Sequence, residues 1–280
     1  MKLLRFGEFG KEKPGIIDKD GKIRDLSSHI TDINGETITS ENLKKISTID
    51  LSSLPIVPNN TRLGACVGNI GKFLCIGLNY SDHAAESGMP VPGEPILFSK
   101  ATSAVVGPND NVEIPKNSSE TDWEVELGIV IGKKAKYINE NEAENYIAGY
   151  CVINDVSERE FQIKREGQWT KGKSCDTFGP TGPYLVTKDE IEDVQNLSMY
   201  LEVNGKKMQN GSTNTMIFSA NHIVYYLSQF MSLHPGDVIA TGTPPGVGLG
   251  MKPPVFLKAG DVMKLGIEGL GEQQQTCIQA

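Results

Sequence analysis

The chain has 280 residues and a formal charge of −8, with 22% charged and 38% hydrophobic residues. This composition is typical of a folded globular protein, and the 30 glycines and 15 prolines indicate many turns. An acidic chain without a basic run is not expected to bind nucleic acid. No apolar run is long enough to cross a bilayer, and the opening MKLLRFGEFG lacks the apolar stretch of a signal peptide. We therefore expect a cytoplasmic protein with no membrane partner.

The cysteines and histidines do not form a recognisable metal-binding pattern. The cysteines are scattered without a C-x-x-C pair, and the histidines show no H-x-x-x-H spacing. We expect reduced, mostly buried cysteines, and neither a disulfide framework nor a zinc site made of thiolates or histidines.

The first 70 residues differ from the rest of the chain. KLLRFG and PGIIDKDGKIRDLS indicate short strands, the latter containing an Asp-Gly turn, and polar, weakly helical sequence follows. We expect a small N-terminal α/β domain over residues 1–70 and a larger domain over residues 71–280.

The larger region is rich in short apolar runs that predict strands. These runs lie at residues 72–79, 95–100, 111–115, 124–132, 146–155, 182–187, 197–208, 237–243 and 261–269. Asn204-Gly205 predicts a hairpin. Since strands and helices do not alternate regularly, a doubly wound sheet or a TIM barrel is disfavoured. The expected class is α+β, predominantly β and mostly antiparallel.

Helices are expected at residues 139–147, 156–166 and 219–232. In the last segment Ile223, Tyr226, Leu227 and Phe230 share one face, which indicates core packing, and Pro235-Gly236 is expected to end the helix.

One apolar strand carries two glutamates on the same face. In TDWEVELGIVIG, Trp123 and the odd-numbered apolar residues line one side, while Glu124 and Glu126 share the other. A solvated second face would explain the pattern. A cation held between the two carboxylates would also explain it, and a third ligand would decide between these interpretations.

Asp155 is the candidate third ligand, because it follows the apolar strand AGYCVIN and precedes a helical pattern. An N-cap role for Asp155 is the competing explanation. Three carboxylates would make an all-oxygen site suited to Mg²⁺ or Mn²⁺. Calcium also binds oxygen ligands, but the D-x-[DN]-x-[DN]-G loop is absent from the sequence.

Three further segments carry polar residues that could take part in catalysis or ligand binding. In NYSDHAAESG, His83 and Glu86 are three residues apart, so on a helix they would form a general-base pair or an ordinary surface pair. Gly77, Gly88 and Pro90 around them favour a mobile loop. Lys171 or Lys173 could stabilise a developing oxyanion, although most lysines are solvated. TGTPPGVGLG lacks the features of a phosphate loop and predicts a rigid turn that presents Thr241 or Thr243 to a ligand.

Together these motifs resemble the fumarylacetoacetate hydrolase family from about residue 72 to the C-terminus. The matching segments, all in the family's order, are IGLNYSDHAAE, PILFSKATSAVVGP, DWEVELGIVIG, NDVSERE, WTKGKSCDTFGPTGP, MIFS and IATGTPPGVG. The resemblance implies a mixed β-roll or sandwich catalytic domain over residues 71–280, usually in a homodimer. The opening MKLLRFG and the ending of the chain look most like bacterial members that act on 2,4-diketo-3-deoxy sugar acids, many of which carry ureidoglycolate lyase or dienedioate isomerase labels.

The resemblance also implies roles for individual residues. It implies a metal bound by Glu124, Glu126 and Asp155, a dyad of His83 and Glu86 on a lid, and Lys173 on substrate oxygens. It further implies that the substrate contacts Arg159, Gln162 and Thr243.

The reaction implied is hydrolysis of the C3–C4 bond of a 2,4-diketo acid, with Mg²⁺ or Mn²⁺ as cofactor. His83 would activate water to attack C4, and a pyruvate enolate would leave, stabilised by the metal and Lys173. Oxaloacetate decarboxylation and isomerisation of 2-hydroxyhepta-2,4-diene-1,7-dioate pass through related enolates and stay open as alternatives. A non-catalytic binding protein is a further alternative.

Overall fold

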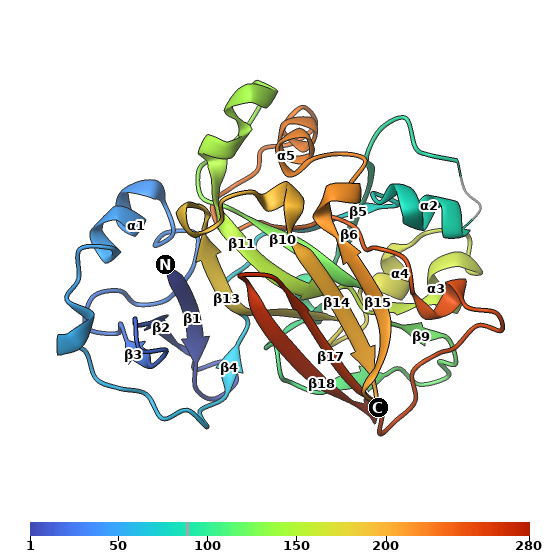
Figure 1. Ribbon diagram of the computed structural model, residues 1–280, viewed down its shortest axis with the longest axis horizontal. Coiled ribbons are helices and arrows are strands. Elements are labelled where there is room, and N and C mark those ends of the chain that lie inside the picture. Colours follow the sequence, from blue (N-terminus) through green and yellow to red (C-terminus); the bar gives the residue numbers. More distant parts are fainter. Residues whose placement is uncertain (88–89) are drawn as a thin grey trace.

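The computed structural model describes residues 1–87 and 90–280 and shows a predominantly β architecture of mixed sheets (Figure 1). The predicted fold class is therefore confirmed. Gly88, which the sequence pattern places in a mobile loop, lies outside the described residues.

The larger sheet has eleven strands. Along the sheet they are β3 (Ile23–Asp25), β2 (Lys13–Ile17), β1 (Lys2–Phe6), β13 (Gly179–Thr187), β11 (Ile147–Asn154), β10 (Val125–Ile131), β16 (Val238–Ala240), β5 (Phe73–Gly77) and β6 (Ile96–Lys100). Two short strands flank this row, with β4 (Leu63–Gly64) on β1 and β7 (Val105–Val106) on β13. Most neighbours are antiparallel, whereas β16 and β5, and β13 and β7, are parallel.

The second sheet has five strands and packs on one face of the larger sheet (Figure 1). Its order is β15 (Lys206–Ser212), β14 (Ser198–Val203), β17 (Val262–Ile267), β18 (Gly271–Gln279) and β8 (Val112–Ile114). The predicted Asn204-Gly205 hairpin joins β14 to β15, with both residues at positive φ. A separate two-stranded ladder pairs β9 (Thr121–Asp122) with β12 (Ser157–Glu158).

The helices are short. The α-helices are α1 (Ser40–Ile46), α2 (Ser81–Ser87), α3 (Arg159–Ile163), α4 (Thr170–Lys173) and α5 (Ala220–Ser228). Single turns of 3₁₀ helix occur at η1 (Leu51–Ser53), η2 (Thr102–Ala104), η4 (Lys188–Glu190), η5 (Val194–Asn196), η6 (Thr213–Thr215) and η7 (Gly248–Gly250), and a longer one at η3 (Glu140–Tyr146). Among the described residues, no helix is long and apolar enough to cross a membrane.

The predicted helix over residues 219–232 ends four residues early, at Ser228. Ile223 and Leu227 are buried as expected, but Phe230 is 63% exposed, so its predicted place in the core is wrong. The helix ends early because Leu233 forms a β-bridge with Ala135, in which the two residues exchange backbone hydrogen bonds. The chain must be extended at this bridge and cannot continue as a helix. The predicted helix at residues 139–147 is likewise the 3₁₀ helix η3 rather than an α-helix.

Strand β10 lies at the centre of the larger sheet and is buried on both faces. Leu127 and Ile129 pack toward the second sheet, in one core with Leu265 of β17. Val130, on the opposite face, belongs to a separate core that includes Ile38 of the N-terminal segment. The face that carries Glu124 and Glu126 is therefore not a solvated face, and that interpretation of the alternating pattern is wrong.

The N-terminal strands continue the larger sheet, because β1 pairs with β13 at Leu3 and Leu185 (Figure 1). The division into residues 1–70 and 71–280 stays a prediction.

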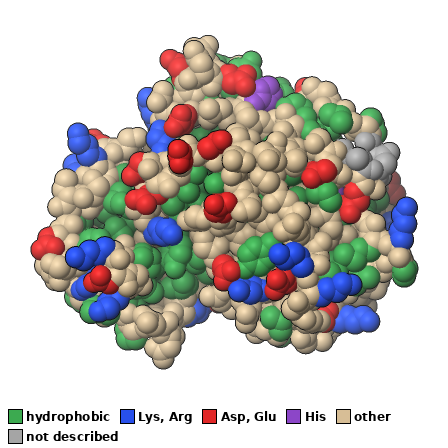
Figure 2. All heavy atoms as spheres, in the orientation of Figure 1, with side chains coloured by type: hydrophobic (Ala, Val, Ile, Leu, Met, Phe, Trp, Pro, Cys, Tyr) green, Lys and Arg blue, Asp and Glu red, His purple; other side chains and the backbone are tan. Residues whose placement is uncertain are grey.

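Over the face shown in Figure 2, Lys and Arg side chains are interspersed with Asp and Glu side chains.

The close packing of β11 against β13 yields a stability prediction. A Cβ at Gly149 would lie 2.1 Å from the carbonyl oxygen of Val186, a backbone atom that cannot move aside. Gly149→Ala is expected to lower the free energy of unfolding by about 1–3 kcal/mol, measured by urea denaturation. In the control Gly93→Ala the new Cβ meets nothing within 4 Å, so its effect should stay within about 0.5 kcal/mol. Equal stability of the two variants would contradict this packing.

Candidate active site and metal centre

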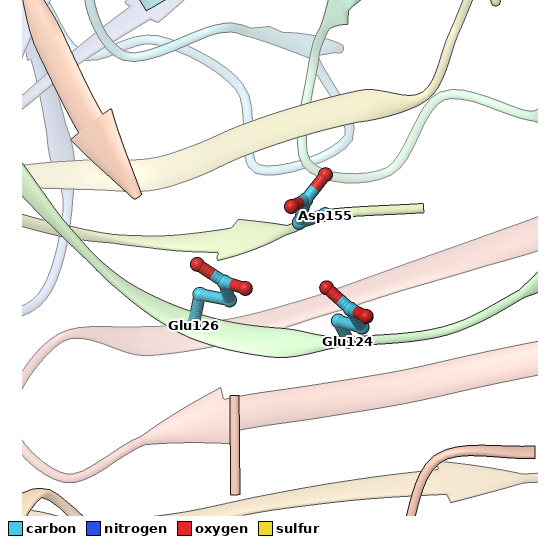
Figure 3. A group of neighbouring side chains, drawn as sticks. All are labelled: Glu124, Glu126 and Asp155. Carbon is cyan, nitrogen blue, oxygen red and sulfur yellow. The ribbon is translucent and has the colours of Figure 1, made fainter. Parts of the chain in front are cut away.

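Glu124, Glu126 and Asp155 point toward one another across the junction of β10 and β11 (Figure 3). The two strands are antiparallel with Val125 opposite Asn154, and the Asp155 N–H donates to the Glu124 carbonyl at 2.9 Å. This register brings Asp155 next to both glutamates. One oxygen from each carboxylate lies within 4.8 Å of the other two, so the triad could hold a metal ion.

The N-cap alternative for Asp155 is wrong. The N-cap of α3 is Glu158, whose side chain accepts from the Glu160 N–H, while Asp155 turns toward the glutamates.

Three buried cations neutralise two of the three carboxylates. The Lys173 ammonium donates to Glu124 Oε2 at 2.7 Å and to Asp155 Oδ2 at 2.8 Å. Arg159 Nη2 lies 2.7 Å from Glu124 Oε1, and Lys100 forms an ion pair with Asp155 Oδ1. Lys100 is 3% exposed and was not singled out from the sequence, where it is only the last residue of a predicted strand.

Glu126 is the carboxylate with the least compensation. Within the described part of the chain, its Oε2 accepts a hydrogen bond from the Gly242 N–H at 2.7 Å. Burial, and then the charges of Asp155 and Glu124, raise the pKa of Glu126 well above its usual value. Burial opposes the charge of Glu124 as well, yet Lys173 and Arg159 lower the pKa of Glu124 to about 2. A divalent cation fits this all-oxygen donor set, since it would supply the positive charge that Glu126 lacks.

A cavity of about 380 Å³ opens beside the carboxylates. The polar end of the cavity is formed by His83, Glu86, Glu124, Glu126, Arg159, Gln162, Lys173 and Thr243, and Lys252 also lines the cavity. The structure therefore brings together every predicted site residue except Asp155, which lies just behind them. Their roles in binding and catalysis remain predictions.

His83 and Glu86 lie on α2 and contact each other. His83 Nδ1 is 3.2 Å from Glu86 Oε2, and both carboxylate oxygens of Glu86 are 3.2 Å from the Gly246 N–H. Glu86 thus orients the imidazole and also ties α2 to the turn that follows β16.

Thr243 lies at the cavity wall, but its hydroxyl group is already engaged. Oγ1 donates to the Val125 carbonyl at 2.9 Å and accepts from Gln209 Nε2 at 2.8 Å. A substrate carboxylate at Thr243 would therefore have to use the backbone N–H or displace the Val125 carbonyl.

Asp122 is a buried residue of the site that sequence reasoning did not assign. It is 0% exposed, and Oδ2 accepts from Arg159 Nε at 2.9 Å and from the Leu249 N–H at 3.0 Å. Oδ1 accepts from the Gly248 N–H at 2.7 Å. Asp122 therefore joins Arg159 to η7, which forms part of the cavity wall. The sequence did carry a signal for this residue, because Asp122 lies two positions before Glu124 and so shares the face of Glu124 and Glu126 in the alternating pattern.

The family is shown by comparison with known proteins. Residues 72–278 match the family described as "Fumarylacetoacetate (FAA) hydrolase C-terminal", and the chain belongs to this family. It is 60% identical over 276 residues to a Burkholderia lata protein that carries the name "putative hydrolase", with 98% of both chains covered.

Two solved structures are similar over the whole of both chains. Fumarylacetoacetate hydrolase from psychrophilic Exiguobacterium antarcticum is 36% identical, with a TM-score of 0.90. Maleylpyruvate hydrolase from Sphingobium sp. SYK-6, solved in complex with manganese(II) ion and pyruvate, is 28% identical, with a TM-score of 0.83.

The Asp122–Arg159 pair predicts a large effect on stability. Asp122→Asn removes the buried charge that faces the guanidinium, so the free energy of unfolding should fall by about 3 kcal/mol in urea denaturation. Asp20→Asn, at an exposed aspartate, is the control and should change it by less than about 0.5 kcal/mol. Wild-type stability of Asp122→Asn would show that the pair is dispensable.

The acidic triad predicts stabilisation by a metal. Mn²⁺ should raise the free energy of unfolding by about 2.7 kcal/mol at about 100 times its Kd, read as an increase in Tm. Glu126→Gln should abolish this response, yet be at least as stable as the wild type in chelator because it removes a buried, uncompensated charge. Glu192→Gln, at an exposed glutamate, should respond to Mn²⁺ as the wild type does. A full Mn²⁺ response in Glu126→Gln would rule out the triad as the binding site.

Proposed function

We propose that the chain is a divalent-metal-dependent hydrolase that cleaves the C3–C4 bond of a 2,4-diketo acid to pyruvate and a carboxylic acid. The observation that carries this proposal is that the His83–Glu86 pair, Lys173 and the glutamates of the acidic triad line one cavity. The similar maleylpyruvate hydrolase, whose structure was solved with manganese(II) ion and pyruvate bound, supports it. The cofactor is Mg²⁺ or Mn²⁺.

The polar end of the cavity suits the 2-oxo acid head of the substrate. Arg159 Nη1 donates to Gln162 Oε1 at 3.0 Å, which leaves the Gln162 amide N–H groups as donors for an anionic ligand. When bound, a divalent ion would polarise the oxygens of the head group.

Lys173 is suited to stabilise the negative charge that develops on the substrate. Burial opposes its charge, but Asp155 and Glu124 raise its pKa, so the ammonium stays protonated at neutral pH. A fixed ammonium in a buried site can stabilise an enolate oxygen without reorganising solvent.

His83 is suited to activate water. Its Nδ1–H donates to Glu86, so Nε2 is the free base that accepts a proton from the water attacking C4. As the new C4–O bond forms, the C3–C4 bond breaks and its electron pair passes to the enolate. The proton held by His83 then serves to protonate C3, which completes pyruvate.

The His83–Glu86 pair favours hydrolysis over decarboxylation. Oxaloacetate decarboxylation requires no activated water, whereas isomerisation of a 2-hydroxydienoate would use the same pair for proton transfer and stays an alternative. A binding protein without activity would bind 2-oxo acids and release no product.

We further propose a cytoplasmic homodimer, as expected for the family.

Metal-dependent pyruvate release from acetylpyruvate tests the proposal. With Mg²⁺ or Mn²⁺ the wild type should release pyruvate, and excess chelator should stop the release. His83→Ala should lower kcat by about 10²- to 10⁴-fold, because it removes the general base. The control His29→Ala, at an exposed histidine of the N-terminal region, should keep wild-type kcat. Turnover of oxaloacetate alone, or full activity of His83→Ala, would contradict the hydrolytic assignment.

A further inference from the structure

Asn79 is a fully buried polar residue between β5 and α2, the helix that carries His83 and Glu86. It belongs to the IGLNYSDHAAE segment, yet it is not one of the described residues that line the cavity. A polar side chain that reaches neither water nor a ligand has its hydrogen bonds met within the protein. The partners of Asn79 therefore show which parts of the structure it holds together.

Asn79 fixes the start of α2 against the MIFS motif. Its Oδ1 accepts from the Phe218 N–H at 2.8 Å, and its Nδ2 donates to the Phe218 carbonyl at 3.0 Å. The Asn79 carbonyl accepts from the Ile217 N–H at 2.8 Å. The next residue, Tyr80, forms a β-bridge with Met216, and α2 begins directly after it. The helix that carries the proposed general base therefore starts from a fixed point.

The same amide group also contacts the peptide that binds Glu126. Nδ2 donates its second hydrogen to the Thr241 carbonyl at 2.8 Å, and the Gly242 N–H at the other end of this peptide donates to Glu126 Oε2 at 2.7 Å. A hydrogen bond accepted by a peptide carbonyl polarises the group and strengthens the donation from its N–H. One peptide group thus connects Asn79 to Glu126.

The close approach of Asn79 to this peptide requires a glycine. Gly242 has a φ of 98°, and a Cβ at this position would lie 2.8 Å from the Asn79 Cβ and 3.2 Å from the Ile76 carbonyl oxygen. Glycine adopts this conformation without steric cost. A larger residue would push the peptide away from the Asn79 amide.

The residue before Asn79 has a backbone conformation that its surroundings must hold. Leu78 lines the cavity and has a φ of 52°, in the left-handed region that is unfavourable for a residue with a branched side chain. Such conformations persist where neighbouring contacts determine the path of the chain. The contacts of Asn79 supply this restraint directly after Leu78.

We propose that Asn79 is a positioning residue that holds the His83 imidazole and the Glu126 carboxylate in a fixed spatial relation. It binds the turn that follows β16 from the start of α2, and Glu86 binds the same turn through the Gly246 N–H from the end of this helix. The water-activating base and the metal-binding carboxylate are thereby mounted on one turn. The inference rests on the proposed function for the role of His83.

The affinity for Mn²⁺ tests the link to Glu126 without requiring turnover. Asn79→Ala removes the donor to the Thr241 carbonyl, so the Kd for Mn²⁺ should rise by about 10- to 100-fold, the usual effect of losing a contact that orients a metal ligand. Free Mn²⁺ is measured by electron paramagnetic resonance. A merely structural role for Asn79 would lower the stability and leave the Kd unchanged.

Gln273→Ala is the matched control. Gln273 is also buried, and its amide donates to backbone carbonyls of β11 and β13. It is not one of the described residues that line the cavity. Gln273→Ala should therefore lose stability but keep the wild-type Kd for Mn²⁺ and the wild-type kcat.

Turnover of acetylpyruvate tests the link to His83. With each variant saturated with Mn²⁺, Asn79→Ala should lower kcat by roughly 10- to 100-fold, because a small displacement of a reacting group has an effect of this size. Wild-type Kd or wild-type kcat in a folded Asn79→Ala variant would overturn the inference. A wild type that binds Mn²⁺ but releases no pyruvate would contradict the proposed function alone, and the Kd comparison would still test Asn79.

Gly242→Ala provides a second variant of the same link. The new Cβ points at Asn79 and leaves the contacts between Asn79 and the MIFS motif in place. The Kd for Mn²⁺ should rise as it does in Asn79→Ala, and circular dichroism establishes that each variant is folded. If Asn79→Ala does not fold, a wild-type Kd in Gly242→Ala would overturn the inference.

Discussion

The site depends on one electrostatic constraint, which is that three buried carboxylates lie close together. Like charges in a medium of low dielectric constant repel strongly, so such a cluster persists only beside opposite charges. Glu124 and Asp155 form ion pairs with Lys173, Lys100 and Arg159. Glu126, in contrast, accepts a hydrogen bond from the backbone N–H of Gly242. The remaining negative charge at Glu126 is what makes a divalent cation the natural completion of the site.

The fold meets this constraint through strand register rather than through loops. Glu126 lies on β10 and Glu124 directly precedes this strand, and the antiparallel pairing of β10 with β11 brings Asp155 beside both. The opposite side of β10 packs into the core between the two sheets, so the carboxylates are mounted on a rigid central strand. The groups proposed to act on the substrate come from short helices, with His83 on α2 and Lys173 on α4. This division places the charge cluster on the rigid element and the proton-transfer group on a peripheral one.

Much of the fold and the polar end of the cavity could be predicted from the sequence. Alternation in TDWEVELG implied that Glu124 and Glu126 share a face, and period-2 geometry alone is enough for that conclusion. Strand β18 escaped prediction because its inward positions include Gln273 and Gln275, which are buried and donate to backbone carbonyls. Polar residues on the inner face hide the hydrophobic alternation on which strand prediction relies.

The contacts of the supporting charges could not be predicted, because each charge pairs with a residue distant in the sequence. Asp122 meets Arg159 across 37 residues, and Lys100 meets Asp155 across 55. Nothing local distinguishes Lys100 from a solvated lysine at the end of a strand. The early end of α5 has the same origin, since the bridge between Leu233 and Ala135 spans nearly a hundred residues.

The central claim is that the triad binds a divalent cation next to a site for 2-oxo acids. Anomalous diffraction from crystals grown with Mn²⁺ and pyruvate tests it most directly. The account predicts one Mn²⁺ coordinated by Glu124, Glu126 and Asp155, with pyruvate at the polar end of the cavity. An ion bound elsewhere, or a triad that stays metal-free at saturating Mn²⁺, would contradict it.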